Sequence, residues 1–583
     1  MRTRLSPILL LALLLAPPAL ADTLTVKIIA INDFHGNLQS PGKFRADAQS
    51  PDVPAGGADV LAGYVAYLKA QNPNHVVVSA GDLIGASPLV SALFHDEGTI
   101  EAMDRLGLDF NAVGNHEFDK GRQELLRMQS GGCSKKDENT CKGAQVGTPV
   151  PFEGAHFQFL AANVLDEVSG KPIFPAYVVK TFNGLRVAFI GLTLKATPTM
   201  VTPTGVAGLR FADEAATISA LVQQLHADGI HSIVVLIHQG GQQTGTPPAD
   251  INACAGGLEG SPIQAIVNQL DDAVDLVISG HTHQAYICQI ANHAGRLIPV
   301  SSASAFGRLV TDIDMTLDTT TKKTLAVAAR NIVVDRTNTS ITADAAIRKI
   351  VDQYAALAAP LANRVVGRVT ADINMSLAPG GESALGDLIA DAQLEATRAS
   401  GGAVVAFMNR GGIRASLEFS QGALSPGDGR VTYGELFSVQ PFGNSLVTMT
   451  LTGAQLKILL EEQFKGCTLD FPLGKNLGRV GDQILQVSEG FTYTWNPAGP
   501  ACEKVDPASI KINGVTVGPT SKYRLTTNSF LADGGDQLYE FTYGTDRVGG
   551  PQDIDALAAY FAAHSSVSPI QVERIKRTSS ANP

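Results

Sequence analysis

The sequence predicts a layered α/β protein with two folded regions, and three observations lead to this prediction. The chain has 583 residues, more than a single hydrophobic core accommodates, and 44% of them are hydrophobic. From residue 24 to about residue 332, short runs rich in Val and Ile alternate with stretches of helical periodicity. A second mixed pattern follows from about residue 364 to about residue 564. Such alternation is typical of sheets covered by helices.

The first region contains short apolar runs that we interpret as buried strands. The runs are continuously apolar rather than alternating, as expected of strands that are covered on both faces. They span residues 24–31, 75–79, 111–113, 186–190, 232–237 and 275–279. In layered α/β folds the carboxyl ends of such strands form the ligand-binding crevice.

A helix is predicted between the two regions, over residues 342–361. Its apolar side chains fall on one helical face, Thr342 is a plausible N-cap, and Pro360 marks the end. We interpret this helix as the connector between two domains. In the second region, residues 384–398 and 453–464 are predicted to be helical.

The N-terminal residues 1–21 have the pattern of a signal peptide. Arg2 and Arg4 precede an apolar run over residues 8–15. Ala19 and Ala21, with one residue between them, form a small-x-small cleavage pattern. A membrane anchor is the alternative, but the run is shorter than the ~20 residues that span a bilayer. We expect cleavage after Ala21, a periplasmic or secreted protein without a membrane anchor, and a polar tail over residues 566–583.

The charge balance and the cysteines agree with an exported protein that acts on a small molecule. Lys plus Arg is 44 and Asp plus Glu is 55, so the net charge is −11, which argues against nucleic-acid polymers as partners. Six cysteines in an exported chain fit disulfides. Sequence proximity favours Cys133–Cys141, Cys254–Cys288 and Cys467–Cys502, although 15 connectivities are open. The sequence does not indicate the oligomeric state.

Residues that can bind metals follow the predicted strands of the first region. Five of the 12 histidines lie in these positions, together with carboxylates and an amide. The candidates are Asp33, His35, Asp82, Asn115, His116, His238, His281 and His283. Taken singly, each is more often a surface residue, a turn residue or a satisfied core residue. Taken together at strand ends, they predict convergence on one ligand site.

The local spacing of these residues supports the same interpretation. In Asp33-x-His35 and His281-x-His283, side chains two residues apart on extended backbone point the same way. Gly81, Gly114 and Gly280 directly precede candidate ligands, where a glycine lets the backbone turn sharply and approach an ion.

Ordered motifs in the first region resemble those of calcineurin-like metallophosphoesterases, specifically the 5′-nucleotidase family. These motifs are Asn32-Asp33-Phe34-His35-Gly36, Gly81-Asp82, Gly114-Asn115-His116-Glu117-Phe118-Asp119, His238 and Gly280-His281-Thr282-His283. The resemblance spans most of the mature chain. It implies a four-layer α/β/β/α phosphoesterase domain over residues 22–335, a connector over 336–363, and a mixed α/β nucleotide-recognition domain over 364–565.

The resemblance also implies how the residues divide the chemistry. Asp33, His35, Asp82 and His283 would hold one divalent ion, and Asp82, Asn115, His238 and His281 the other. The ions could be Zn, Mn, Co or Fe, because mixed imidazole and oxygen ligands suit all four. A metal-bound hydroxide would attack the phosphorus, and His116 with Asp119 would form a catalytic dyad. A solvated first-turn residue is the ordinary alternative for Asp119.

Three motifs in the second region resemble the nucleoside-binding domain of the same family. They imply substrate contacts from Asn409, Arg414, Phe442, Asn444, Phe530 and Asp536. The two aromatic rings could sandwich a base, and Asp536 could accept hydrogen bonds from ribose. Taken alone, each Phe is more often a core residue. Near Glu382, where relatives carry Arg, this chain reads Pro379-Gly380-Gly381, which leaves the preferred leaving group open.

The sequence therefore predicts a two-metal hydrolase that removes phosphate from nucleoside 5′-phosphates and related nucleotides. One alternative is another hydrolase of the kinds that occur around this fold: a nucleotide-sugar or NAD pyrophosphatase, a 2′,3′-cyclic nucleotide phosphodiesterase, or a sulfur-ester hydrolase. A second alternative, from another class, is a non-catalytic nucleoside-binding surface protein. Every ligand position of the motifs that resemble the family carries a residue able to bind a metal, which disfavours the non-catalytic binding protein.

Overall fold

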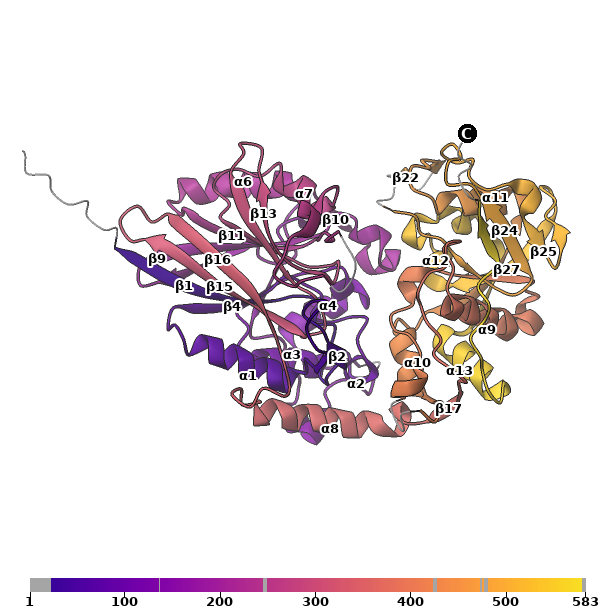
Figure 1. The fold of residues 1–583 in the computed structure, drawn as a ribbon, viewed down its shortest axis with the longest axis horizontal. Coiled ribbons are helices and arrows are strands. Elements are labelled where there is room, and N and C mark those ends of the chain that lie inside the picture. Colours follow the sequence, from indigo (N-terminus) through magenta and orange to yellow (C-terminus); the bar gives the residue numbers. More distant parts are fainter. Residues whose placement is uncertain are drawn as a thin grey trace, which may run out of the picture.

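The computed structural model describes residues 22–578, except residues 136, 245–248, 423–426, 472–473 and 476–480. The expected signal peptide, residues 1–21, and the last five residues of the polar tail lie outside this described part. None of the helices within the described residues is both long enough and apolar enough to cross a membrane. Figure 1 shows two α/β domains side by side, with helix α8 (Ala345–Ala362) running beneath the first domain toward the second.

The N-terminal domain contains two six-stranded sheets. The first has the order β16 (Thr324–Val333), β15 (Leu309–Asp318), β1 (Thr23–Ile31), β4 (His75–Ser79), β5 (Phe110–Ala112) and β6 (Gln158–Leu160). The second has the order β13 (Ala285–Ala291), β14 (Leu297–Ala303), β12 (Leu276–Ser279), β11 (Ser232–His238), β9 (Leu185–Thr193) and β8 (Tyr177–Phe182). The predicted strands are all present, with ends that differ by up to three residues.

The two sheets pack face to face between layers of helices. In β1, Val26 and Ile28 belong to the core between the sheets, whereas Ile29 packs with Leu61 of α1 (Ala58–Lys69). Helices α3 (Glu97–Leu106) and α4 (Gly121–Ser130) cover the same sheet, and α6 (Glu214–Ala227) and α7 (Pro262–Val267) cover the other. Strands buried on both faces must be continuously apolar, which explains their sequence pattern. The four layers confirm the predicted α/β/β/α arrangement.

The central strands of each sheet are parallel, and this places their ends together. Strands β1, β4, β5 and β6 run in one direction, as do β9, β11, β12 and β14. The chain leaves β1, β4, β5, β11 and β12 at their carboxyl ends and enters a loop each time. These five loops, or the last residue of the strand, carry the candidate ligands.

The C-terminal domain is a mixed α/β unit, as predicted. Its main sheet has the order β23 (Gln486–Val487), β18 (Val405–Met408), β27 (Lys522–Asn528), β20 (Ser445–Thr452) and β28 (Thr545–Gln552). A smaller sheet contains β26 (Val515–Thr516), β25 (Lys511–Ile512), β24 (Phe491–Trp495) and β29 (Ile575–Arg577). Its helices include α9 (Ala384–Gly401), α10 (Tyr433–Val439), α11 (Gly453–Glu462) and α13 (Asp553–Ala563).

The connector helix α8 begins three residues later than predicted. Asp344, not Thr342, caps it, because the Asp344 carboxylate accepts a hydrogen bond from the Ile347 N–H at 2.8 Å. Pro360 lies inside the last turn, and the helix continues to Ala362. The buried face of α8 packs on the N-terminal domain, where the Tyr354 hydroxyl donates to Glu101.

All three expected disulfides are present. They join Cys133 to Cys141, Cys254 to Cys288 and Cys467 to Cys502. Each bond closes a loop of 8 to 35 residues, which restricts the unfolded chain. Two of them stabilise the N-terminal domain and one the C-terminal domain.

Candidate active site

The side chains at the strand ends of the N-terminal domain converge on two adjacent groups. The potential ligand atoms of Asp33, His35 and His283 lie within 4.8 Å of one another. The same is true of Asp82, His238 and His281. Each group combines a carboxylate with imidazoles from different strands, a donor set that suits a transition-metal ion.

Asp82 lies between the two groups. Its Oδ2 atom is 3.0 Å from Nε2 of His238 in one group and 3.6 Å from Nε2 of His35 in the other. Within the group of Asp33, His35 and His283, Nε2 of His35 is 3.1 Å from Nε2 of His283. One carboxylate can therefore face two cations, as the sequence motifs imply.

The imidazoles are held so that Nε2 faces the centre of the site. Nδ1 of His238 lies 2.8 Å from the carbonyl oxygen of Ala80, and Nδ1 of His35 lies 2.8 Å from that of Gly85. A carbonyl can only accept, so each Nδ1 carries the proton and leaves the Nε2 lone pair for a metal ion. Oδ1 of Asn115 is buried without a hydrogen-bond partner among the described residues, as expected of an atom that ligates a metal. Nε2 of His238 is also buried, and it faces Oδ2 of Asp82 without forming a hydrogen bond of normal geometry.

The electrostatics of the site favour a cation. Burial lowers the pKa of His35 and of His281 to about 3, which keeps both imidazoles neutral and able to ligate. Burial also opposes protonation of His238, yet the Asp82 carboxylate outweighs it and raises the pKa of His238 to about 10. Burial raises the pKa of Asp33 to about 7. A divalent ion would replace these protons, so the residues present fit a metal centre.

The ligand loops have a strained backbone. Five of the seven candidate ligands have positive φ, which is rare for residues other than glycine: Asp33 (49°), His35 (47°), Asp82 (51°), His281 (71°) and His283 (56°). Such strain persists only where the surrounding structure enforces it, and it concentrates at functional sites. Gly114 is needed here, because a Cβ at that position would lie 2.1 Å from Oδ1 of Asp82.

Glu117 supports these loops, a role that the sequence interpretation missed. Its buried carboxylate accepts hydrogen bonds from the backbone N–H groups of Asp82 (3.0 Å), Leu83 (2.8 Å) and Gly114 (2.6 Å). It thereby ties the loop after β4 to the loop after β5. The position of Glu117 within the motif from Gly114 to Asp119 is the sequence feature that could have indicated this supporting role.

His116 and Asp119 form a pair beside the metal-binding groups. Nδ1 of His116 lies 2.8 Å from Oδ2 of Asp119, and the same carboxylate oxygen accepts the Ala86 N–H at 3.1 Å. The backbone N–H of His116 donates to Asp82 at 2.9 Å. Burial alone would lower the pKa of His116, but the carboxylates of Asp119 and Asp82 raise it. His116 is therefore placed to carry a proton toward the centre.

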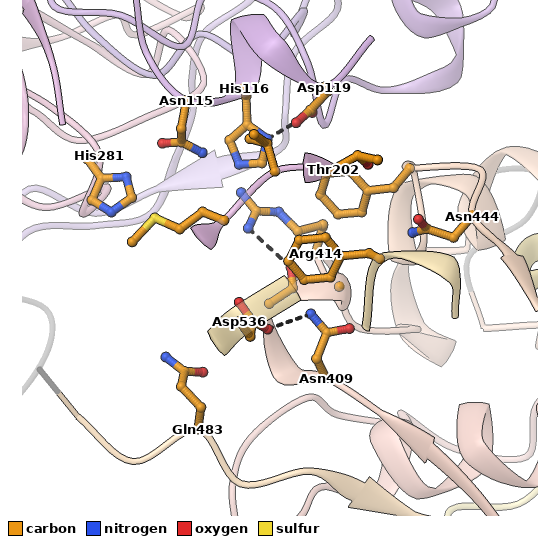
Figure 2. A pocket seen from close by; sticks show the side chains of 16 residues that line it. Asn115, His116, Asp119, Thr202, His281, Asn409, Arg414, Asn444, Gln483 and Asp536 are labelled. Carbon is orange, nitrogen blue, oxygen red and sulfur yellow. Dashed lines mark hydrogen bonds and ion pairs between the residues drawn. The ribbon is translucent and has the colours of Figure 1, made fainter. Parts of the chain in front are cut away.

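The C-terminal domain faces this centre across a pocket of about 270 Å³. Figure 2 shows His116 and Asp119 on one wall, Asn409 and Asp536 on the other, and Arg414 between them. All six residues predicted to contact the substrate line this pocket: Asn409, Arg414, Phe442, Asn444, Phe530 and Asp536. Of the predicted metal ligands, Asn115 and His281 reach the pocket wall, whereas the other five lie outside its lining.

One ring contact links the two walls, and two further contacts order the C-terminal wall. The Phe442 ring stacks on the His116 ring, with centroids 5.6 Å apart and planes 19° apart. The Arg414 guanidinium lies 5.9 Å from the Phe442 centroid. On the C-terminal wall, the Asn409 amide donates to the Asp536 carboxylate at 2.8 Å. Phe442 thus contacts the dyad as well as the pocket.

Other residues of the pocket carried no signal in the sequence. Met200, Val201, Thr202 and Gln483 line it from segments without a recognisable motif. Glu382, which follows the position of the missing Arg, points away to the C-terminal strand, since both its carboxylate oxygens accept the Ile575 N–H at 3.0 Å. Among the residues lining the described pocket, Arg414 is the one arginine.

Comparison with known proteins agrees with this geometry. Residues 26–285 match the family model of calcineurin-like phosphoesterases, and residues 365–543 match that of the 5′-nucleotidase C-terminal domain. The chain belongs to the 5′-nucleotidase family of calcineurin-like phosphoesterases. Its fold is similar to that of the 5′-nucleotidase precursor from Thermus thermophilus, with a TM-score of 0.74, 24% identity, and coverage of 95% of this chain and 99% of that one.

Two similar proteins are longer than this chain. Endonuclease YhcR of Bacillus subtilis is 30% identical over 92% of this chain, which spans 39% of that protein. Cell wall protein Lmo0130 of Listeria monocytogenes is 31% identical over 90% of this chain, which spans 65% of it. The 5′-nucleotidase of Rattus norvegicus is 22% identical, over 95% of this chain and 91% of that protein.

Proposed function

We propose that the protein is a metal-dependent hydrolase that removes phosphate from nucleoside 5′-phosphates and related nucleotides. The observation that carries the proposal is the position of Asp82 between two ligand groups that adjoin His116 and open toward the C-terminal-domain pocket. A binding protein would need neither a carboxylate shared by two groups nor a His–Asp pair beside it. The similarity to 5′-nucleotidases in both domains supports this function.

The seven ligands would hold two divalent ions. Asp33, His35 and His283 would form one site, His238, His281 and Asn115 the other, and Asp82 would belong to both. Bound there, the two ions would activate a water molecule and neutralise charge on the phosphate. Zn, Mn, Co and Fe all suit these ligands.

His116 would act on the phosphate oxygens and Arg414 would neutralise their charge. Asp119 fixes the tautomer of His116 through Nδ1 and holds its pKa up, so Nε2 can donate a proton or hydrogen bond to the leaving oxygen. Arg414 lines the same pocket as His116, and the carboxylates of Asp82, Asp119 and Asp33 interact electrostatically with it, so its guanidinium would face the reacting phosphate.

The nucleoside would lie in the pocket on the C-terminal domain. Phe442 and Phe530 offer aromatic faces for a base, and base stacking tolerates any base. Asn409 and Asp536, joined by a hydrogen bond, offer polar atoms for ribose hydroxyls. The C-terminal domain would thus bind the nucleoside, and the N-terminal, metal-binding domain would carry out the hydrolysis.

An exported protein is the setting that we propose for this activity. Three disulfides form in an oxidising compartment, and cleavage after Ala21 would release the mature chain into the periplasm or the medium. The name of the relative Lmo0130, a cell wall protein, is consistent with export.

Phosphate release from AMP tests the proposal. We expect release by protein loaded with a divalent metal, loss after EDTA, and recovery when the metal is restored. UDP-glucose, NAD and 2′,3′-cyclic AMP in the same assay separate a nucleotidase from a pyrophosphatase or a cyclic phosphodiesterase. Protein that binds two metal ions and releases no phosphate from any of these substrates would refute the function.

A further inference from the structure

A second and larger cavity lies between the two domains. Its volume is about 640 Å³, compared with about 270 Å³ for the nucleoside pocket. The N-terminal domain contributes the loop over residues 36–41, residues 86 and 88–90, Phe306 and Arg308. The C-terminal domain contributes residues 414–416, Glu418 and parts of α10 and its N-cap. Hydrolysis of a nucleoside monophosphate gives this cavity no role.

The cavity borders the metal-binding groups from the side of Phe306. The Phe306 ring lies 5.3 Å from the His283 ring and 5.9 Å from the His35 ring, centroid to centroid. Arg414 lines both this cavity and the nucleoside pocket. A group attached to a phosphate at the metal centre could therefore extend past Arg414 into the second cavity.

Arg308 is a partly exposed cation that lines this cavity, and none of the described carboxylates pairs with it. Its Nη2 donates to the carbonyl oxygen of Pro41 at 3.1 Å, and its guanidinium lies 5.0 Å from the Phe306 centroid. Its Nε is buried and donates to no acceptor among the described residues. In the same part of the chain, no carboxylate oxygen lies within 4.0 Å of the guanidinium. Burial accordingly lowers the pKa of Arg308, with no acid to oppose the shift.

Other partly buried arginines of the same domain pair with carboxylates. Arg336 lies 2.9 Å from Asp59, and Arg127 lies 2.6 Å from both Glu97 and Glu124. A buried charge without a partner is costly, so an arginine left unpaired beside a cavity indicates a site for an anion. The planar fork of N–H donors matches phosphate and carboxylate oxygens.

The acids of the cavity lie on the opposite domain. Glu435 accepts hydrogen bonds from the N–H and hydroxyl of Thr432, at 2.7 and 2.8 Å, and so completes the capping box in which Thr432 is the N-cap of α10. Glu418 also belongs to the wall contributed by the C-terminal domain. Arg414 lies on the same wall as these two acids, so Arg308 is the cation that the N-terminal domain contributes to the cavity lining.

We propose that this interdomain cavity binds a phosphoryl anion at Arg308. Given the proposed function, on which this choice of anion rests, the phosphoryl group has two sources. It is either a distal phosphate of a substrate whose scissile phosphorus lies at the metal centre, or free inorganic phosphate. In both cases the phosphoryl oxygens would accept hydrogen bonds from the Nη groups of Arg308, which lines the cavity, whereas its Nε is buried.

The variant Arg308→Gln distinguishes these sources, with Arg45→Gln as the matched control. Arg45 is an exposed arginine paired with Asp52, so its loss removes the same charge from the surface. If the anion is a distal phosphate, Arg308→Gln lowers the ratio of kcat/KM for ADP to that for AMP by about tenfold, the loss of one charge-assisted hydrogen bond. If it is free phosphate, the ratio stays constant and the noncompetitive part of phosphate inhibition disappears.

Binding of inorganic phosphate to the metal-loaded protein, measured by calorimetry, gives a readout that needs no turnover. We expect one more phosphate site in the wild type than in Arg308→Gln, and no loss of a site in Arg45→Gln. Equal site numbers in all three proteins, with an unchanged ADP to AMP ratio, would overturn the proposal. If Arg308→Gln does not fold, crystals of the wild type soaked in phosphate decide: density against Arg308 supports the site, and phosphate at the metal centre alone overturns it. A wild type that binds phosphate at Arg308 but hydrolyses no nucleotide would refute only the proposed function.

Discussion

The two walls of the cleft differ in burial and in how their side chains are held. On the N-terminal side, the metal-binding residues Asp33, His35, Asp82 and His238 lie behind the pocket lining, are almost completely buried and are anchored by backbone groups. On the C-terminal wall, Phe442, Asn444, Phe530 and Asp536 lie on short helical turns and loops, and most of them are partly exposed. Arg414 belongs to the second wall but lies against the first.

This difference indicates a division of tasks. A metal centre requires ligands fixed to within fractions of an ångström, and strained loops tied by Glu117 provide that rigidity. A nucleoside pocket requires contact area and a few polar atoms, and it tolerates partly exposed side chains. Substitutions on the first wall should therefore reduce turnover, and substitutions on the second should reduce substrate affinity.

The largest effect is expected from Asp82→Ala, which removes the carboxylate shared by both ligand groups. Without Asp82 the metal ions would be bound weakly, and their stabilisation of the transition state by several kcal/mol would be lost. This loss should lower kcat by about a thousandfold or more. Phosphate release from AMP and metal content by mass spectrometry measure this effect. The exposed Asp52→Ala, which breaks only a surface pair with Arg45, should retain full activity and both metals. Full activity in Asp82→Ala would contradict its position in the centre.

His116→Ala should lower kcat for AMP by about a hundredfold to a thousandfold, the usual size of a general acid contribution. Metal content should stay unchanged, because neither metal-binding group includes His116. This variant separates proton transfer from metal binding on the same wall. Loss of a metal ion together with activity would mean that His116 is a ligand rather than an acid.

Glu117→Gln tests whether rigidity of the first wall depends on the backbone contacts behind it. A neutral amide has one acceptor atom in place of two, so it cannot serve the N–H groups of Asp82, Leu83 and Gly114 together. We expect metal affinity to fall by about 10- to 100-fold, as for other residues that support metal ligands. Titration of the metal-free protein with a divalent metal measures this affinity. An unchanged affinity would show that the ligand loops keep their conformation without the hydrogen bonds to Glu117.

Phe530→Ala probes the second wall. Loss of base stacking should raise KM for AMP by about tenfold while kcat changes little. Ribose 5-phosphate carries the same phosphate ester without a base, so its hydrolysis should be nearly unaffected. An equal effect on both substrates would place Phe530 in the fold of the pocket rather than in base recognition.

The smallest effect is expected at His95, which lines neither the nucleoside pocket nor the second cavity. The hydrogen bond between His95 and Glu124 raises the pKa of His95. Burial alone would raise the pKa of Glu124, but hydrogen bonds from His95 and Arg127 lower the pKa of Glu124 to about 2. A raised histidine pKa stabilises the fold below the unfolded value near 6.5, and the contribution is lost as pH rises through the folded pKa. His95→Gln should therefore cost about 1 kcal/mol at about pH 5.5 and much less near pH 9. Denaturant unfolding at both pH values measures it, and kcat should not change; equal losses at both would exclude this origin.

The sequence by itself determined the elements and the chemistry of the first wall. Continuous apolar runs predicted strands covered on both faces, and ligands placed directly after them had to meet once the strands were parallel. The three disulfides followed from sequence proximity. The helix start was misplaced because both Thr and Asp are common N-cap residues, and the structure has the stronger of the two, Asp344, as the N-cap.

Other features were decided only by the tertiary structure. The hydrogen bonds of Glu117, the stacking of Phe442 on His116, and the lining by Met200 and Gln483 join residues far apart in the chain. The unpaired state of Arg308 is of the same kind, since a missing partner can be recognised only when all neighbours are placed. Local sequence patterns report backbone periodicity and burial, whereas such contacts depend on how two domains and several loops pack against one another.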